Sequence, residues 1–177
     1  QIVGERPDRR VAHRCGHQLA AAAAEPETVG AQRAHPPPPR RVAAGVPGRF
    51  NVMDYRGATV IADYGHNPDA MRALVSAVEA LPAQRRSVVI SGAGDRRDQD
   101  IREQTQILGG AFDDVILYQD ACQRGREDGE VIGLLRQGLG NAARATRIDE
   151  VRGEFLAIDT ALDRLEPGDL CLVLVDQ

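Results

Sequence analysis

The fold is decided by ATVIADYGHNPDAMRALVSAVEAL, residues 58–81, which joins a β-favouring run to a helical run through a short polar turn. Residues 58–63 are small, apolar or β-branched, as is typical of a buried strand. Apolar side chains then recur at helical spacing over residues 71–81. Asn67 can cap this helix, and Pro68 suits its first turn. The stretch predicts a strand, a turn and a helix, the repeating unit of an α/β fold.

The same alternation extends over the rest of the chain. Residues 50–55 form another β-favouring run, and Arg56-Gly57 predicts a hairpin turn between it and residues 58–63. Further strands are expected at residues 87–91, 114–118, 146–149 and 170–175, with helices ending near residue 112 and spanning about 129–139 and 151–165. The pattern predicts a Rossmann-like three-layer sandwich. Its mostly parallel sheet has about six strands and an N-terminal antiparallel hairpin.

Composition excludes several classes of protein. All 22 basic residues are arginine, so this chain holds neither a P-loop lysine nor a Schiff-base lysine. A net charge of -4 and few aromatic side chains argue against nucleic-acid binding. No apolar run approaches the roughly 20 residues of a membrane helix. Cys15, Cys122 and Cys171 lack the close pairing of zinc and redox motifs. We expect a cytoplasmic protein that binds neither nucleic acid nor membrane.

Residues 1–46 differ in composition from the remainder. They contain ten Ala, seven Arg and the run of prolines at 36–39, but no aromatic residue. Such a segment cannot bury enough apolar surface to offset its ordering entropy, so disorder is expected. Its composition fits either a flexible linker or GC-rich codons read out of frame. We therefore place the folded domain at residues 47–177.

A first candidate site lies at DYGHNP, residues 63–68. Asp63 ends a strand, and His66 and Asn67 open a helix, so a carboxylate, an imidazole and free helix N–H groups converge at the carboxyl edge of the sheet. Such a place suits a phosphate, a ribose hydroxyl or an amino-acid headgroup. A structural interpretation is also open, in which Asp63 and Asn67 cap the helix and His66 closes a turn.

Two charged loops follow the next strands. GAGDRRD, residues 92–98, combines a glycine turn with two arginines that could bind carboxylate or phosphate in a bidentate way. Alternatively, Asp98 or Asp100 caps the following helix and the arginines pair internally. RGRED, residues 124–128, lies at the same expected edge, and surface charge is the competing interpretation there.

These motifs form an ordered series. They run PGRFN (47–51), DYGHNP (63–68), GDRRDQDI (94–101), and RGR (124–126) together with GEV (129–131). In this order and spacing they resemble the C-terminal domain of the Mur ligase family, and within it the cyanophycin synthetase type. The resemblance covers about residues 47–177. One such motif would be weak evidence, whereas four in order are strong.

The resemblance implies an ATP-dependent ligase that activates a carboxylate as an acyl phosphate, which an incoming amine attacks. In the cyanophycin synthetase type, arginine is joined to the side-chain carboxylate of an aspartate in a growing Asp-Arg polymer. The C-terminal domain closes over ATP held by a central P-loop domain and helps to seat the incoming amino acid. Closing charged loops in this way would exclude water and position the amine.

Residue roles are implied by the same resemblance. Arg49 and Asp63 would approach the nucleotide, while His66 and Asn67 would lie near the phosphates and the reacting groups. Contacts to the amino acid or polymer are expected from Asp95, Arg96, Arg97, Asp98, Arg124 and Arg126. No residue is assigned to a metal. ATP and Mg²⁺ would be held mainly by the central domain, and this chain would bind neither of them tightly.

The sequence also departs from a complete enzyme of this type. It lacks the Gly-Lys-Thr/Ser phosphate loop, the magnesium ligands of the central domain and the ATP-grasp module. We expect a fragment that is inactive alone and whose partners are those missing domains, with any homo-oligomer formed through the parent enzyme. Two alternatives stay open: a stand-alone module that binds an amino acid or nucleotide, and the C-terminal domain of a peptidoglycan-precursor or folylpolyglutamate ligase.

Overall fold

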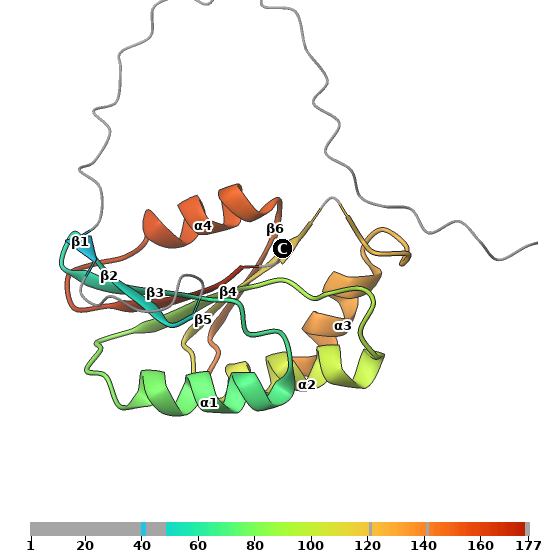
Figure 1. Ribbon diagram of the computed structural model, residues 1–177, viewed down its shortest axis with the longest axis horizontal. Coiled ribbons are helices and arrows are strands. Elements are labelled where there is room, and N and C mark those ends of the chain that lie inside the picture. Colours follow the sequence, from blue (N-terminus) through green and yellow to red (C-terminus); the bar gives the residue numbers. More distant parts are fainter. Residues whose placement is uncertain (1–39, 42–48, 121, 141, 176–177) are drawn as a thin grey trace, which may run out of the picture. The chain divides into compact units, whose positions relative to one another are not determined.

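The computed structural model describes residues 40–41, 49–120, 122–140 and 142–175 (Figure 1). In chain order the elements are β1 (Arg40–Arg41), β2 (Asn51–Tyr55), β3 (Ala58–Asp63), α1 (Pro68–Glu79), β4 (Arg86–Ile90), α2 (Asp98–Gly109), β5 (Asp114–Gln119), α3 (Glu130–Gly138), β6 (Arg147–Arg152), α4 (Glu154–Leu162) and β7 (Leu170–Leu174). Among these residues, no helix has the length and apolar character required to cross a bilayer.

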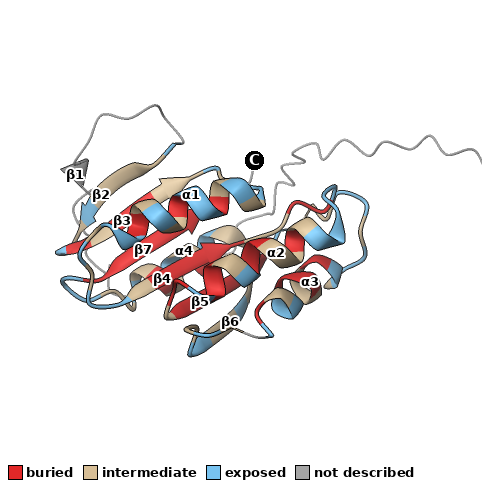
Figure 2. Cartoon of the chain, turned by 90° about the horizontal axis from the view of Figure 1, so that it is seen from below, coloured by how far each residue is buried: buried red, intermediate tan, exposed pale blue. Residues whose placement is uncertain are grey.

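One mixed sheet organises the domain. Its strand order is β1-β2-β3-β7-β4-β5-β6; β2 pairs antiparallel with both β1 and β3, and every pairing from β3 onward is parallel. β5 and β7 are buried along their whole length, and Figure 2 shows the centre of the sheet in red. Such continuous burial explains why these strands read as unbroken apolar runs.

Helices cover both faces of the sheet, as predicted. α1, α2 and α3 lie on one face and α4 on the other (Figure 1). Alternate residues of β7 therefore enter different cores: Leu170 and Leu172 pack beneath α1–α3, whereas Cys171 and Val173 pack with Ala157 of α4. After β3 the chain forms β4, β5 and β6 in turn toward one edge of the sheet, and it then returns to the centre to form β7. Because such crossovers are right-handed, the reversal of direction places α4 on the face opposite α1, α2 and α3.

The predicted hairpin is confirmed. β2 and β3 pair antiparallel and are joined by Arg56 and Gly57, whose φ angles are 54° and 84°. Two consecutive positive φ angles are the signature of the tight turns that match the twist of paired strands. The Arg56 guanidinium lies 5.0 Å from the centre of the Tyr55 ring, a cation–π contact that adds to the turn.

The structure departs from the sequence-based elements in two places. β6 runs to Arg152, so α4 begins at Glu154, and residue 151, expected in the last helix, belongs to the strand. Gly153, with a φ of 96°, makes the turn between them. A seventh strand, β1, is too short to leave a periodic signal in the sequence. Apart from β1, the segment 1–46 lies outside the described residues.

The thiol of Cys171 provides a test of the core. Cys171 is fully buried on β7, and burial raises the pKa of its thiol to about 11, with a hydrogen bond to Ser87 opposing part of the shift. Because the thiolate is the reactive form, native Cys171 should react with iodoacetamide at pH 8 at least ~100-fold more slowly than in urea. Mass spectrometry of the peptide that carries it measures both rates, and equal rates would contradict the buried position.

Candidate functional site

A cationic cavity lies at the carboxyl edge of the parallel strands. The loops after β3, β4 and β5 meet there with the end of β7, because the strands run in the same direction. The cavity has a volume of about 230 Å³ and is lined by Arg49, Tyr64, His66, Ala93, Arg96, Arg124 and Val175. Four of the ten predicted site residues, three arginines and one histidine, therefore come together. No carboxylate is among these lining residues.

Asp63 holds the backbone around this cavity. One carboxylate oxygen accepts a hydrogen bond from the Phe50 backbone N–H, and the other from the Gly65 N–H, both at 2.7 Å. Phe50 has a φ of 44°, in the left-handed region, and the bond from Asp63 supports this unfavourable conformation. Asp63 is not a lining residue; it positions Arg49 and the loop that carries His66.

His66 and Asn67 have different environments. The Nδ1 atom of His66 lies 2.9 Å from the Tyr64 carbonyl oxygen, which can only accept, so Nδ1 carries the proton and neutral His66 keeps Nε2 as an acceptor. Asn67 caps α1 by accepting a hydrogen bond from the Ala70 N–H at 2.9 Å. The turn and cap of the structural interpretation are both present, and His66 in addition lines the cavity.

The loop after β4 separates its two arginines. Arg96 lines the cavity, and its side chain forms no ion pair with any residue in the described ranges. Arg97 is 82% exposed and pairs with Asp100 at 2.8 Å, which lowers the pKa of that carboxyl. Neither Asp98 nor Asp100 caps α2; the N-cap position is Arg97, without a side-chain bond. The alternative interpretation, in which the arginines of this loop pair internally, therefore holds for Arg97 but not for Arg96.

Arg126 joins this loop to the one after β5. Its guanidinium donates to the carbonyl oxygens of Gly94 at 2.6 Å and Arg96 at 2.7 Å, and it pairs with Asp98 at 2.8 Å and Glu130 at 2.6 Å. The hydrogen bonds that it donates to Asp98 and Glu130 raise its already high pKa. With these bonds made inside the protein, Arg126 fixes the loops that present Arg96.

Arg124 and Asp95 form the rim between the same two loops. Arg124 lines the cavity with a φ of 50° and lies 3.5 Å from the Asp95 carboxylate. Asp95 is itself mostly exposed and does not line the cavity. Gly94 permits this approach, because a Cβ atom there would collide with the Gln123 carbonyl oxygen. Tyr64, Ala93 and Val175 also line the cavity without having been singled out from the sequence.

The arrangement suits an anion. The three guanidiniums can bind phosphate or carboxylate oxygens through charge-assisted hydrogen bonds, and neutral His66 offers Nε2 as an acceptor beside them. A divalent cation has no comparable site, since the described residues contain no group of three His, Cys, Asp or Glu placed to hold a metal. Magnesium prefers oxygen ligands, which the lining side chains supply only through Tyr64.

Comparisons with known proteins identify the family of the domain. Residues 48–174 match the model of the Mur ligase glutamate ligase domain. The chain belongs to this family. The domain is 35% identical over 127 residues to the cyanophycin synthetase of Geminocystis herdmanii, covering 72% of this chain and 14% of the relative. The chain therefore spans about a seventh of that relative's length.

Solved structures of the family share the fold. A UDP-N-acetylmuramoyl-L-alanyl-D-glutamate–2,6-diaminopimelate ligase matches with a TM-score of 0.63 and 24% identity, covering 75% of this chain and 26% of that one. Escherichia coli FolC in complex with ADP matches with a TM-score of 0.59 and 28% identity, covering 73% and 28%. The predicted Rossmann-like architecture and the resemblance to Mur ligase C-terminal domains are confirmed.

Proposed function

We propose that residues 48–174 are the C-terminal lid domain of an ATP-dependent amide ligase of the cyanophycin synthetase type. The observation that carries the proposal is the cavity in which Arg49, Arg96, Arg124 and His66 converge without an acidic lining residue. Its charge suits the phosphates of ATP, or the acyl phosphate and carboxylate formed from them. The 35% identity to a cyanophycin synthetase supports this type over the peptidoglycan and folate relatives.

In this proposal the domain acts by positioning. The arginines orient the anionic groups, and His66, whose ring is held by the Tyr64 carbonyl, offers the Nε2 lone pair to a hydrogen-bond donor such as the incoming amine. Closure of the loops over the nucleotide would exclude water, which would otherwise hydrolyse an acyl phosphate. Mg²⁺ would be bound by the P-loop domain of the complete enzyme, because this cavity offers it no carboxylate. The chain alone should not turn over ATP.

A chimera tests the proposal. Residues 48–174 would replace the matching segment of the Geminocystis herdmanii cyanophycin synthetase, and ATP consumption would be followed with Asp-Arg polymer, aspartate and arginine. Activity in the chimera, with none in the chain alone, is the expected outcome. A folded chimera that consumes no ATP would contradict a lid role, and binding of nucleotide by the chain alone would then favour a stand-alone module.

Substitutions of two neighbouring arginines can be compared directly within that chimera. Arg96→Gln should lower kcat/KM by about 10- to 100-fold, because it removes an ion contact to the bound anion worth about 1.5–3 kcal/mol. Arg97→Gln should change it less than about twofold, since Arg97 faces solvent and pairs with Asp100. Melting temperatures of both variants control for folding. Equal effects of the two substitutions would show that the cavity does not bind the substrate.

A further inference from the structure

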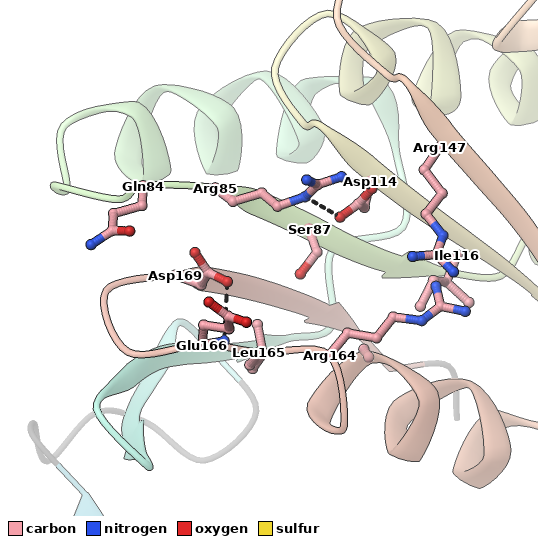
Figure 3. A pocket seen from close by; sticks show the side chains of 11 residues that line it. Gln84, Arg85, Ser87, Asp114, Ile116, Arg147, Arg164, Leu165, Glu166 and Asp169 are labelled. Carbon is pink, nitrogen blue, oxygen red and sulfur yellow. Dashed lines mark hydrogen bonds and ion pairs between the residues drawn. The ribbon is translucent and has the colours of Figure 1, made fainter.

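A second, larger cavity lies at the amino-terminal ends of the parallel strands, opposite the ends that carry the cationic cavity (Figure 3). It has a volume of about 450 Å³, within the range of small-molecule sites, and opens at the amino ends of β4, β5 and β7 beside the end of α4. A strand of five residues is about 16 Å long, so the length of β4 separates this cavity from the cationic one. None of the sequence motifs predicted it.

One end of this cavity is cationic. Arg147 of β6 and Arg164, just after α4, converge beside Ile116 in Figure 3. Both bind the same carboxylate oxygen of Asp149, Arg147 through Nε at 3.1 Å and Arg164 through Nη1 at 2.5 Å. In the part of the chain that the structure describes, neither guanidinium has a further carboxylate partner. Two positive charges share one negative charge, which leaves a site for an external carboxylate.

The other end is acidic. Asp169 is about nine-tenths buried, and its carboxylate accepts a hydrogen bond from the Glu166 backbone N–H at 3.1 Å. Neither Asp169 nor Glu166 forms an ion pair with any residue in the described ranges. Both line the cavity, and Figure 3 shows their side chains across from Arg147 and Arg164. This end offers two carboxylates to a cation.

The remaining charged pair along the cavity is satisfied internally. Arg85 binds Asp114 in a bidentate way, with Nε–Oδ2 at 2.5 Å and Nη2–Oδ1 at 2.7 Å. The charged residues that line the cavity, together with the Asp149 that binds two of the arginines, are three Arg and four acidic residues, with a net charge of about -1. A phosphate group would face the two acidic side chains of Glu166 and Asp169. The complementary ligand is small, carries one carboxylate and has a net positive charge.

We propose that this cavity binds a basic α-amino acid. The carboxylate lies between Arg147 and Arg164, and the α-ammonium group and cationic side chain lie toward Asp169 and Glu166. The hydroxyl of Ser87, which lies between the two ends in Figure 3, adds a neutral hydrogen-bonding group. The site is independent of the proposed ligase function, because it shares no residue with the cationic cavity.

Titration calorimetry on the full chain tests this site with three probes. L-Arginine carries every group that the cavity recognises, agmatine lacks the carboxylate, and citrulline lacks the side-chain charge. We expect saturable binding of arginine, with agmatine and citrulline each about tenfold weaker or more, as for the loss of one charged hydrogen bond. Absence of saturable arginine binding by the folded chain, or equal affinity for arginine and agmatine, would overturn the proposal.

Matched variants locate the binding. Glu166→Gln and Arg147→Gln should each weaken arginine binding about tenfold or more, and both change exposed or half-exposed side chains that the fold tolerates. Glu79→Gln and Arg102→Gln remove the same charges from helices on the other face and should leave the affinity unchanged. Wild-type affinity in either cavity variant would overturn the proposal. Loss of binding in Arg96→Gln would do so too, because arginine would then occupy the cationic cavity.

Discussion

Replacing Leu172 by alanine is expected to lower the free energy of unfolding by about 2–5 kcal/mol, the largest stability effect foreseen for this chain. Leu172 is fully buried at the middle of β7, within the core beneath α1–α3. β7 pairs with β3 on one side and β4 on the other, so the backbone cannot move to fill the space left by the lost side chain. Urea denaturation followed by circular dichroism measures the change.

Leu156→Ala is the matched control. Leu156 lies on α4 and is 59% exposed, so the same substitution should change stability by less than about 0.5 kcal/mol. The slope of the unfolding free energy with urea should be the same in both variants, since neither alters the surface exposed on unfolding by much. A loss in Leu172→Ala as small as that in Leu156→Ala would show that β7 is not a central strand.

Gly138→Ala should destabilise the domain by about 1–3 kcal/mol or more. Gly138 ends α3 where this helix meets α2, and a Cβ atom there would collide with the Arg102 carbonyl oxygen and the Thr105 hydroxyl. Thr105 is buried and donates to the Leu135 carbonyl at 2.7 Å, so it cannot turn aside without breaking a bond between the two helices. Thermal unfolding should show a lower melting temperature.

Gly133→Ala, in the same helix, should act in the opposite direction. Apart from its chain neighbours and the backbone of its own helix, no described atom lies within 4 Å of the position that its Cβ would take, so alanine can be placed there without strain. Alanine is favoured over glycine inside a helix by about 0.5–1 kcal/mol, and the melting temperature should rise. Destabilisation by both substitutions would contradict this account, because it would show that the loss at Gly138 is not specific to the contact with α2.

Periodicity was sufficient to predict most of the fold. β5 and β7 are buried on both faces, so each leaves an unbroken apolar run, and α1 carries its cap and first-turn proline in the sequence itself. The boundary between β6 and α4 was placed wrongly because Val151 suits either element. The position of this boundary depends on the turn at Gly153, whose positive φ angle the sequence does not reveal.

The candidate site was only partly predictable for a different reason. Spacing indicated that the charged loops meet at one edge, but it could not tell which side chain of each pair faces inward. Arg96 lines the cavity while Arg97 points to solvent, and Arg124 lines it while Arg126 ties the loops together. The second cavity left no local signal at all, because its charged residues come from separate elements that only the folded sheet brings together.

The position of β7 has a consequence for how this domain forms during synthesis. The last strand along the described chain is the one that joins the sheet, because β3 and β4 each pair with β7 and not with each other. Until residues 170–174 leave the ribosome, the sheet of a nascent chain can hold only a β1–β2–β3 unit and a separate β4–β5–β6 unit, each with an open strand edge. Contacts of such long sequence separation favour slow folding, so the interval before β7 docks is when the chain is most prone to aggregate and would gain most from a chaperone.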